Sequence, residues 1–71
     1  MFIHALHGQS LALTKAIRDV PGVKMADAIT GDYDIVASVQ AKDLADLRDI
    51  MAGVQAIGGV LKTTTCMVLA D

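Results

Sequence analysis

The stretch ITGDYDI, residues 29–35, divides the chain into two similar halves. Its Gly31-Asp32 pair is typical of a tight turn between two strands. The segments on either side, residues 23–30 and 33–40, are each bounded by turn-forming residues and contain β-branched side chains. Both segments are therefore predicted to be strands.

Each half also contains a segment with apolar residues at the i, i+3, i+4 spacing of an amphipathic helix. In the first half these residues are Leu13, Ala16, Ile17 and Val20. In the second half they are Leu44, Leu47, Ile50, Met51, Val54 and Ile57. Ser10 and Asp43 are predicted to cap the two helices, and Pro21-Gly22 and Gly58-Gly59 to end them.

Strands predicted at residues 2–7 and 60–69 complete the order β-α-β, turn, β-α-β. The two halves echo each other, because VPGV at residues 20–23 and IGGV at residues 57–60 both join a helix to a strand, offset by 37 residues. With right-handed crossovers, this order predicts an α+β fold of the ferredoxin-like βαββαβ type. We expect one domain over residues 1–71, with a four-stranded antiparallel sheet and both helices on one face.

Both faces of the predicted sheet carry apolar residues, and hydrophobic residues make up 54% of the chain. In residues 33–40, alternation places Tyr33, Ile35, Ala37 and Val39 on one face and Asp34, Val36, Ser38 and Gln40 on the other. Since two helices cover only one face, we expect the sheet of a second subunit to cover the other, giving a dimeric α+β barrel. The alternative is an open face that is mildly apolar.

Charge and composition argue against several classes of function. The net charge is −2 and the six basic residues are scattered, so direct nucleic-acid binding is not expected. No apolar run approaches the roughly 18 residues of a membrane span. The single cysteine, Cys66, excludes an internal disulfide and fits a reducing, cytoplasmic location. Without a Cys/His cluster, neither a metal nor a cofactor is expected.

Three motifs together resemble one family: VPGV at residues 20–23, ITGDYDI at 29–35 and IGGVLKTTT at 57–65. Their order and spacing are similar to those of the effector-binding RAM domain of the Lrp/AsnC (feast/famine) transcriptional regulators. The resemblance implies sheet-to-sheet dimers, often in a ring of four dimers, with amino acids or related metabolites bound in clefts between dimers. Because no helix-turn-helix precedes the first strand, the chain resembles the stand-alone RAM proteins. Co-assembly with full-length regulators is then expected rather than direct transcription-factor activity.

The turn formed by Gly31, Asp32, Tyr33 and Asp34 is the first candidate ligand site. A glycine with positive φ leaves backbone N–H groups open to a ligand carboxylate, and an Asp carboxylate can accept hydrogen bonds from an α-ammonium group. The alternative is a hairpin turn in which Asp32 bonds its own backbone. The family resemblance favours the ligand site, because it places effector clefts beside this turn and the start of the last strand.

Leu61, Thr63 and Thr65 share one face of the last predicted strand and are the second part of the candidate site. The threonine hydroxyls can donate to or accept from a polar ligand, and Leu61 would form an apolar wall. The alternative for both threonines is β-propensity on a half-buried strand.

His4, His7 and Cys66 are not expected to be catalytic or to bind metal. Residues three apart on a strand point to opposite faces, so the two histidines cannot readily bind one ion. Cys66 is expected to be a small buried hydrophobe.

The leading functional hypothesis is a regulatory module, not an enzyme, that oligomerises and binds an amino acid or similar metabolite. The first alternative is a small cofactor-free monooxygenase or isomerase on the same barrel, for which His4, His7 and Tyr33 are the available polar or aromatic groups. The second alternative is a purely structural oligomerisation module.

Overall fold

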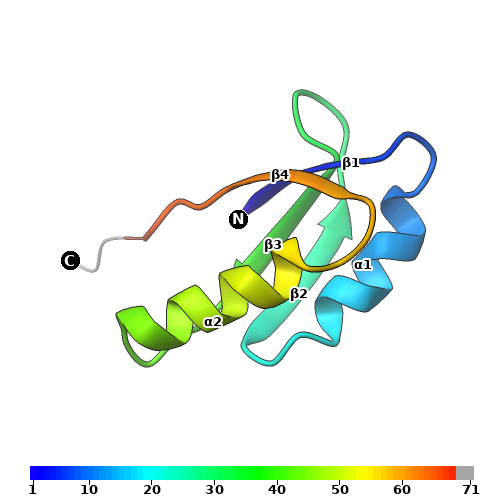
Figure 1. The fold of residues 1–71 in the computed structure, drawn as a ribbon. Coiled ribbons are helices and arrows are strands. Elements are labelled where there is room, and N and C mark those ends of the chain that lie inside the picture. The colour runs from blue at the N-terminus through cyan, green and yellow to red at the C-terminus, as the bar shows by residue number, and fades with distance from the viewer. Residues whose placement is uncertain (69–71) are drawn as a thin grey trace.

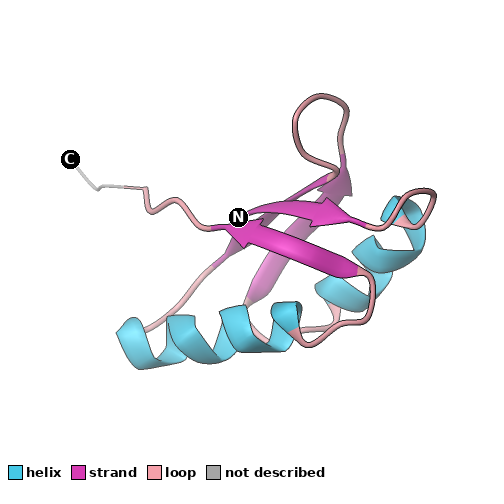
Figure 2. Ribbon diagram, turned by 45° about the horizontal axis from the view of Figure 1, so that its top comes forward, coloured by secondary structure: helices cyan, strands magenta, loops and turns pink. Residues whose placement is uncertain are grey.

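A computed structural model describes residues 1–68 of the chain (Figure 1). Its elements, in order, are β1 (Phe2–Ala5), α1 (Ser10–Arg18), β2 (Val23–Ala28), β3 (Ile35–Val39), α2 (Leu44–Gln55) and β4 (Val60–Thr64). The four strands form one sheet in the order β2-β3-β1-β4, and all neighbouring pairs are antiparallel. Figure 2 shows both helices on one face of this sheet. The predicted ferredoxin-like fold is confirmed.

The hydrophobic core is aliphatic and lies between the sheet and the two helices. Ile3 of β1, Ile17 of α1, Ile35 of β3 and Val54 of α2 are its largest fully buried side chains. Burying each such side chain contributes roughly 1.5–3 kcal/mol relative to leaving it exposed. Because these side chains come from both halves of the chain, neither half has a complete core of its own.

The two helix-to-strand junctions are built alike. In each four-residue turn the last N–H donates to the first carbonyl, at 3.1 Å in residues 20–23 and at 3.2 Å in residues 57–60. The third residue has positive φ in both turns, +96° at Gly22 and +101° at Gly59. Glycine is favoured at this position because other residues rarely adopt such a φ. The repeat seen in the sequence is thus a repeat of turn geometry.

Each of these two glycines packs against the helix of the other half. A Cβ added to Gly22 would lie 2.7 Å from Cγ1 of Ile50 in α2. A Cβ added to Gly59 would lie 3.1 Å from Cδ1 of Leu13 in α1. The first distance is shorter than real Cβ contacts, and the second would require Leu13 to shift by a few tenths of an ångström, so the close approach of the halves favours glycine at both positions.

Of the two predicted helix N-caps, one is confirmed and one is wrong. Asp43 caps α2, because its side chain accepts a hydrogen bond from the Asp46 N–H at 2.8 Å. The prediction for Ser10 is wrong, since Ser10 is the first residue of α1 and Gln9 occupies the N-cap without a side-chain bond. The reason is that the helix starts one residue earlier than a Ser10 cap requires, because the Leu13 N–H already donates to the Gln9 carbonyl at 2.9 Å.

The strands are shorter than predicted. β4 ends at Thr64, which lies opposite Phe2, the first residue of β1. Residues 65–68 therefore extend past the paired part of the sheet, and the last residue of the predicted strand, Leu69, lies outside the described residues. For the same reason Cys66 is exposed, which corrects the prediction that it is buried.

The sheet face away from the helices, called the open face below, has a half-buried row across its centre. Phe2 of β1 pairs with Val36 of β3 on one side and with Thr64 of β4 on the other. All three side chains are of intermediate exposure, and no element of residues 1–68 packs over them as the helices do on the opposite face. This is the face that the sequence predicts to be covered by another subunit.

We predict that Gly22→Ala destabilises the protein by about 3 kcal/mol. The positive φ and the overlap with Ile50 each cost roughly 1–3 kcal/mol, and they act together at this position. Urea denaturation followed by circular dichroism measures the change.

Two other glycines separate these contributions. Gly8 has a φ of +80° and nothing within 4 Å of an added Cβ, so Gly8→Ala should cost only about 1 kcal/mol. Gly58 has neither the positive φ nor a neighbour within 4 Å, so Gly58→Ala should be close to neutral. Equal losses in all three variants would contradict the packing role of Gly22.

Candidate functional site

The loop between β2 and β3, residues 29–34, is fixed at its base. The Ile29 N–H donates to the Asp34 carbonyl at 2.9 Å, which closes the loop on itself. The Asp34 N–H donates to the Ile3 carbonyl of β1 at 2.9 Å, which ties the loop to the sheet. In Figure 1 this loop projects beyond the ends of β2 and β3.

The Asp34 side chain adds a third anchor. Its Oδ2 accepts a hydrogen bond from the Ala5 N–H at 2.8 Å and lies 4.0 Å from Nδ1 of His4. A hydrogen bond from a backbone N–H to a carboxylate is charge-assisted and holds the loop at this point to β1. The side chain that bonds backbone in this loop is therefore that of Asp34 and not that of Asp32. The structural role that the hairpin-turn alternative gives to Asp32 belongs to Asp34.

Tyr33 lies on the open face and belongs to an aromatic cluster formed by Phe2, His4 and Tyr33. Its ring centroid is 5.2 Å from that of Phe2 and 4.5 Å from that of His4. Its hydroxyl is 3.5 Å from Oγ1 of Thr64, at the long limit of a hydrogen bond. The predicted placement of Tyr33 on the same face as Ile35 is therefore wrong, because β3 begins only at Ile35 and Tyr33 belongs to the loop.

The tip of the loop is open. Gly31 has a φ of +112°, and an added Cβ would meet nothing within 4 Å. Gly31 and Asp32 are both exposed. The loop therefore presents a carboxylate and positive-φ backbone at its tip, above a base that is held by three hydrogen bonds.

Leu61 and Thr63 lie elsewhere, in a shallow hollow of about 300 Å³ between α2 and β4. Gln55 at the end of α2 donates from Nε2 to Oγ1 of Thr63 at 2.9 Å. Leu61 is 62% exposed. The hydroxyl of Thr63 is thus already engaged on one side, while Leu61 is free to contact another molecule.

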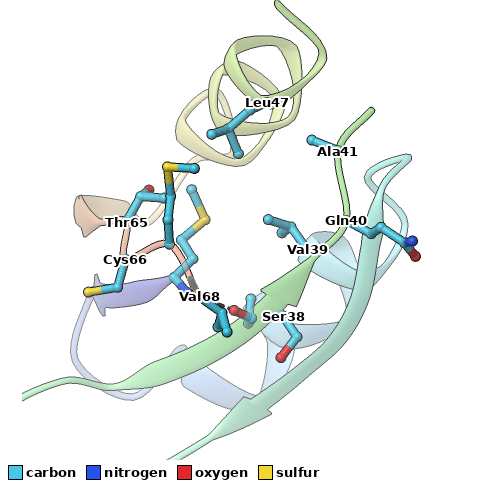
Figure 3. A pocket seen from close by; sticks show the side chains of 11 residues that line it. Ser38, Val39, Gln40, Ala41, Leu47, Thr65, Cys66 and Val68 are labelled. Atoms are coloured by element: carbon cyan, nitrogen blue, oxygen red, sulfur yellow. Dashed lines mark hydrogen bonds between the residues drawn. The ribbon is translucent and has the colours of Figure 1, made fainter. Parts of the chain in front are cut away.

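Thr65 lies in a second hollow of about 410 Å³. Figure 3 shows its wall, formed by Val39 at the end of β3, Leu47 of α2 and the extended segment that contains Thr65 and Cys66. Neither of these two hollows is lined by residues 31–34. Within one chain, the predicted site residues therefore occupy three separate places.

Sequence reasoning missed Gln55, Phe2 and the His4 contact with Tyr33. A signal for two of them was present, because alternation along β1 places Phe2 and His4 on the same face of the strand. Gln55 carries no such signal, since a polar residue at the end of a helix is ordinarily solvated.

Within residues 1–68, no group of three or more His, Cys, Asp or Glu side chains is arranged to hold a metal ion. None of the helices in that range is long and apolar enough to cross a membrane.

Relatives of the chain include much longer proteins. It is 43% identical over 58 residues to a homocitrate synthase from Sulfurisphaera tokodaii and 41% identical over 58 residues to one from Saccharolobus solfataricus. Each alignment covers 82% of this chain but only 13% of the homocitrate synthase. The chain thus corresponds to a small part of those enzymes.

Solved structures of similar length share the fold. A protein from Thermus thermophilus superposes with a TM-score of 0.89 at 32% identity, and the match covers 99% of this chain and 89% of that one. A hypothetical protein from Pyrococcus horikoshii superposes with a TM-score of 0.85 at 21% identity over 99% of this chain and 86% of that one, which shows the fold alone. The family model described as the Lrp/AsnC ligand binding domain matches residues 2–71. On this match, together with the ferredoxin-like fold, the chain belongs to the Lrp/AsnC ligand binding domain family.

Proposed function

We propose that the chain is a regulatory module that binds an amino acid or a related small metabolite in clefts between dimers. The observation that carries the proposal is the loop 29–34, whose base is fixed by hydrogen bonds while its tip is open. A rigid base with free donors and acceptors lowers the cost of ordering a binding site. Family membership supports a ligand-binding role, and the loop is the place that we propose for it.

In this proposal Asp32 accepts hydrogen bonds from the α-ammonium group of the ligand. The backbone near Gly31 is left to receive the carboxylate. Asp34 is assigned a different role, because its carboxylate already bonds the Ala5 N–H at 2.8 Å. Tyr33 and Asp34 then position the loop, and the tip contacts the ligand.

A second chain is needed to complete the site. Leu61, Thr63 and Thr65 line hollows that do not include residues 31–34 of the same chain. We propose that a neighbouring dimer brings its Leu61, Thr63 and Thr65 to the loop tip. Leu61, which is 62% exposed, is the apolar wall of this cleft, and the threonine hydroxyls bond polar groups of the ligand.

The open face is proposed to form the dimer. The aromatic cluster and Val36 make this face apolar at its centre, and a second copy would bury them in a sheet-to-sheet interface. The assembly would then grow to a higher oligomer, such as a ring of four dimers, through the clefts. Co-assembly with full-length regulators through the same surfaces would link ligand binding to transcription.

The homocitrate synthase relatives favour a second candidate for what the module regulates. Because the chain is 41–43% identical to a segment of those enzymes, the second candidate partner is an enzyme instead of a DNA-binding protein. The two candidates are separated by mixing the purified chain with a full-length Lrp/AsnC regulator or with a homocitrate synthase. Size-exclusion chromatography then shows which of the two elutes together with the chain.

The cofactor-free enzyme has less support. A general base should lie beside a cleft that holds the substrate. Nδ1 of His4 lies 4.0 Å from Oδ2 of Asp34, and its ring packs against that of Tyr33 at a tilt of 31°, but His4 lines neither of the two hollows. A purely structural module is distinguished from a sensor by calorimetry, because a scaffold would bind none of the twenty amino acids.

We predict that Asp32→Asn weakens binding of the amino acid identified by calorimetry by about 10- to 100-fold. This range corresponds to the loss of one charge-assisted hydrogen bond. The unfolding free energy should stay within about 0.5 kcal/mol of wild type, because the substitution is at an exposed site.

Two matched variants control this prediction. Asp49→Asn removes one negative charge from an exposed position of α2 and should leave the affinity unchanged. Asp34→Asn weakens the bond to Ala5, so it should lower stability by about 1–2 kcal/mol. Equal loss of affinity in the Asp32 and Asp49 variants would argue against a direct contact with Asp32.

We predict that Val36→Lys converts the assembly to monomers. Val36 is at the centre of the open face, and an ammonium group buried there without a partner costs several kcal/mol. Light scattering coupled to size-exclusion chromatography measures the mass. Leu11→Lys adds the same charge at a position that is 78% exposed on α1, and it should leave the mass unchanged. Dimers in the Val36 variant would place the interface elsewhere.

A further inference from the structure

Arg18 at the end of α1 reaches the free edge of the sheet. Its Nε donates a hydrogen bond to the Ala26 carbonyl of β2 at 2.9 Å. One terminal nitrogen of the same guanidinium lies 3.6 Å from Oδ1 of Asp27. Since β2 is the outermost strand on this side, the guanidinium is held against the sheet edge by two groups of that strand.

The hydrogen bonds of β3 show that the Ala26 carbonyl points out of the sheet. Ala37 exchanges two hydrogen bonds with Met1, each 2.8 Å, so its backbone N–H and carbonyl point toward the β1 side. Ala26 lies opposite Ala37 on the other side. In an antiparallel pair of this kind the N–H and carbonyl of both residues point away from each other. The backbone of Ala26 therefore faces the free edge.

A free edge of this kind is a template for pairing with another strand. β2 is six residues long, and its Met25 is 48% exposed. Both edge strands have one register shift in their pairing, between Val23 and Met25 in β2 and between His4 and Ala5 opposite β4. Regular pairing covers residues 25–28 of β2 but only residues 62–64 of β4. At the regular part of β2, protection against strand addition must therefore come from another group.

We propose that Arg18 closes the β2 edge against strand pairing with a second copy of this chain. The guanidinium donates a hydrogen bond to the outward carbonyl of Ala26, which an incoming strand would need as an acceptor. The incoming strand would be β2 of the second copy, with Ala26 opposite Ala26 across a two-fold axis. Such a contact uses the same patch on both copies and extends the sheet.

Asp27 fixes the guanidinium in this position. Both side chains of the ion pair are about half exposed, at 50% for Arg18 and 54% for Asp27, so the ion pair alone is weak in water. Together with the hydrogen bond to Ala26, it gives the planar guanidinium two fixed contacts. A lysine at position 18 would keep the charge but would lose the paired geometry.

The test is Arg18→Ala, with Lys15→Ala as the matched control. Both substitutions remove one positive charge from the last turn of α1, but Lys15 makes neither of the edge contacts described for Arg18. We expect the self-association constant of the Arg18 variant to rise by about tenfold above wild type. This factor corresponds to the loss of one charge-assisted hydrogen bond that competes with pairing. Sedimentation velocity over a concentration series measures it, and infrared spectroscopy detects the added intermolecular β-sheet.

A second substitution shows whether the new contact uses this edge. The Ala28 N–H faces the same edge as that of Ala26, two residues away along the strand. Proline at position 28 removes a donor that incoming strands need without removing a bond of the sheet itself. Arg18→Ala combined with Ala28→Pro should therefore return to the wild-type assembly.

Three results would overturn the proposal. They are a wild-type assembly for Arg18→Ala, self-association of Lys15→Ala to the same extent, and self-association of the double variant that proline does not suppress. Far-UV circular dichroism checks that each variant is folded. If Arg18→Ala is unfolded, Arg18→Lys replaces it, and a folded lysine variant that associates no more than wild type would also overturn the proposal.

Discussion

Two helices cover one face of a four-stranded sheet, and the rest of the structure depends on this one-sided coverage. All of the largest fully buried side chains, Ile3, Ile17, Ile35 and Val54, lie in the single layer between helices and sheet. That layer can form only if each helix returns closely over its own strand, which the positive-φ turns at Gly22 and Gly59 permit. The same coverage leaves the open face half-buried, with apolar side chains that no helix of residues 1–68 protects.

The loop 29–34 connects this architecture to the proposed function. At its base, the Asp34 N–H donates to the Ile3 carbonyl and the Asp34 carboxylate accepts from the Ala5 N–H, so hydrogen bonds fix the loop to the central strand β1. Its aromatic residue, Tyr33, lies on the open face beside Phe2 and His4. If the open face is the dimer interface, as we propose, association of two sheets and presentation of the loop tip are physically linked. A change in the dimer interface would then alter the position of the loop tip, and the reverse, through Tyr33 and Asp34.

Periodicity predicted the element order, the fold class and the Asp43 cap, because each follows from local spacing of apolar and turn-forming residues. What local patterns could not predict was where pairing stops. Strand alternation predicts Tyr33 on the same face as Ile35, but β3 begins only at Ile35 and the alternation does not extend into the loop. The prediction that Cys66 is buried extends β4 past Thr64. Thr64 pairs with Phe2, the first residue of β1, so β1 offers no partner beyond it and Cys66 is exposed. The site residues were predicted individually, but their separation into a loop and two hollows depends on tertiary packing.

Face and edge make opposite contributions to assembly. A sheet offers two ways to associate, by stacking a face or by extending an edge, and both would be available to a chain whose sheet is covered on one side only. The open face presents half-buried apolar side chains, which favour stacking. At the β2 edge the carbonyl of Ala26 accepts a hydrogen bond from Arg18, and at the other edge only residues 62–64 of β4 pair regularly. If both edges are closed in this way, association is directed to the face, where a closed dimer forms instead of an unlimited sheet. If the ligand sites lie in clefts between dimers, as we propose, a closed assembly of fixed size gives every copy the same clefts, because every copy then associates through the same surfaces.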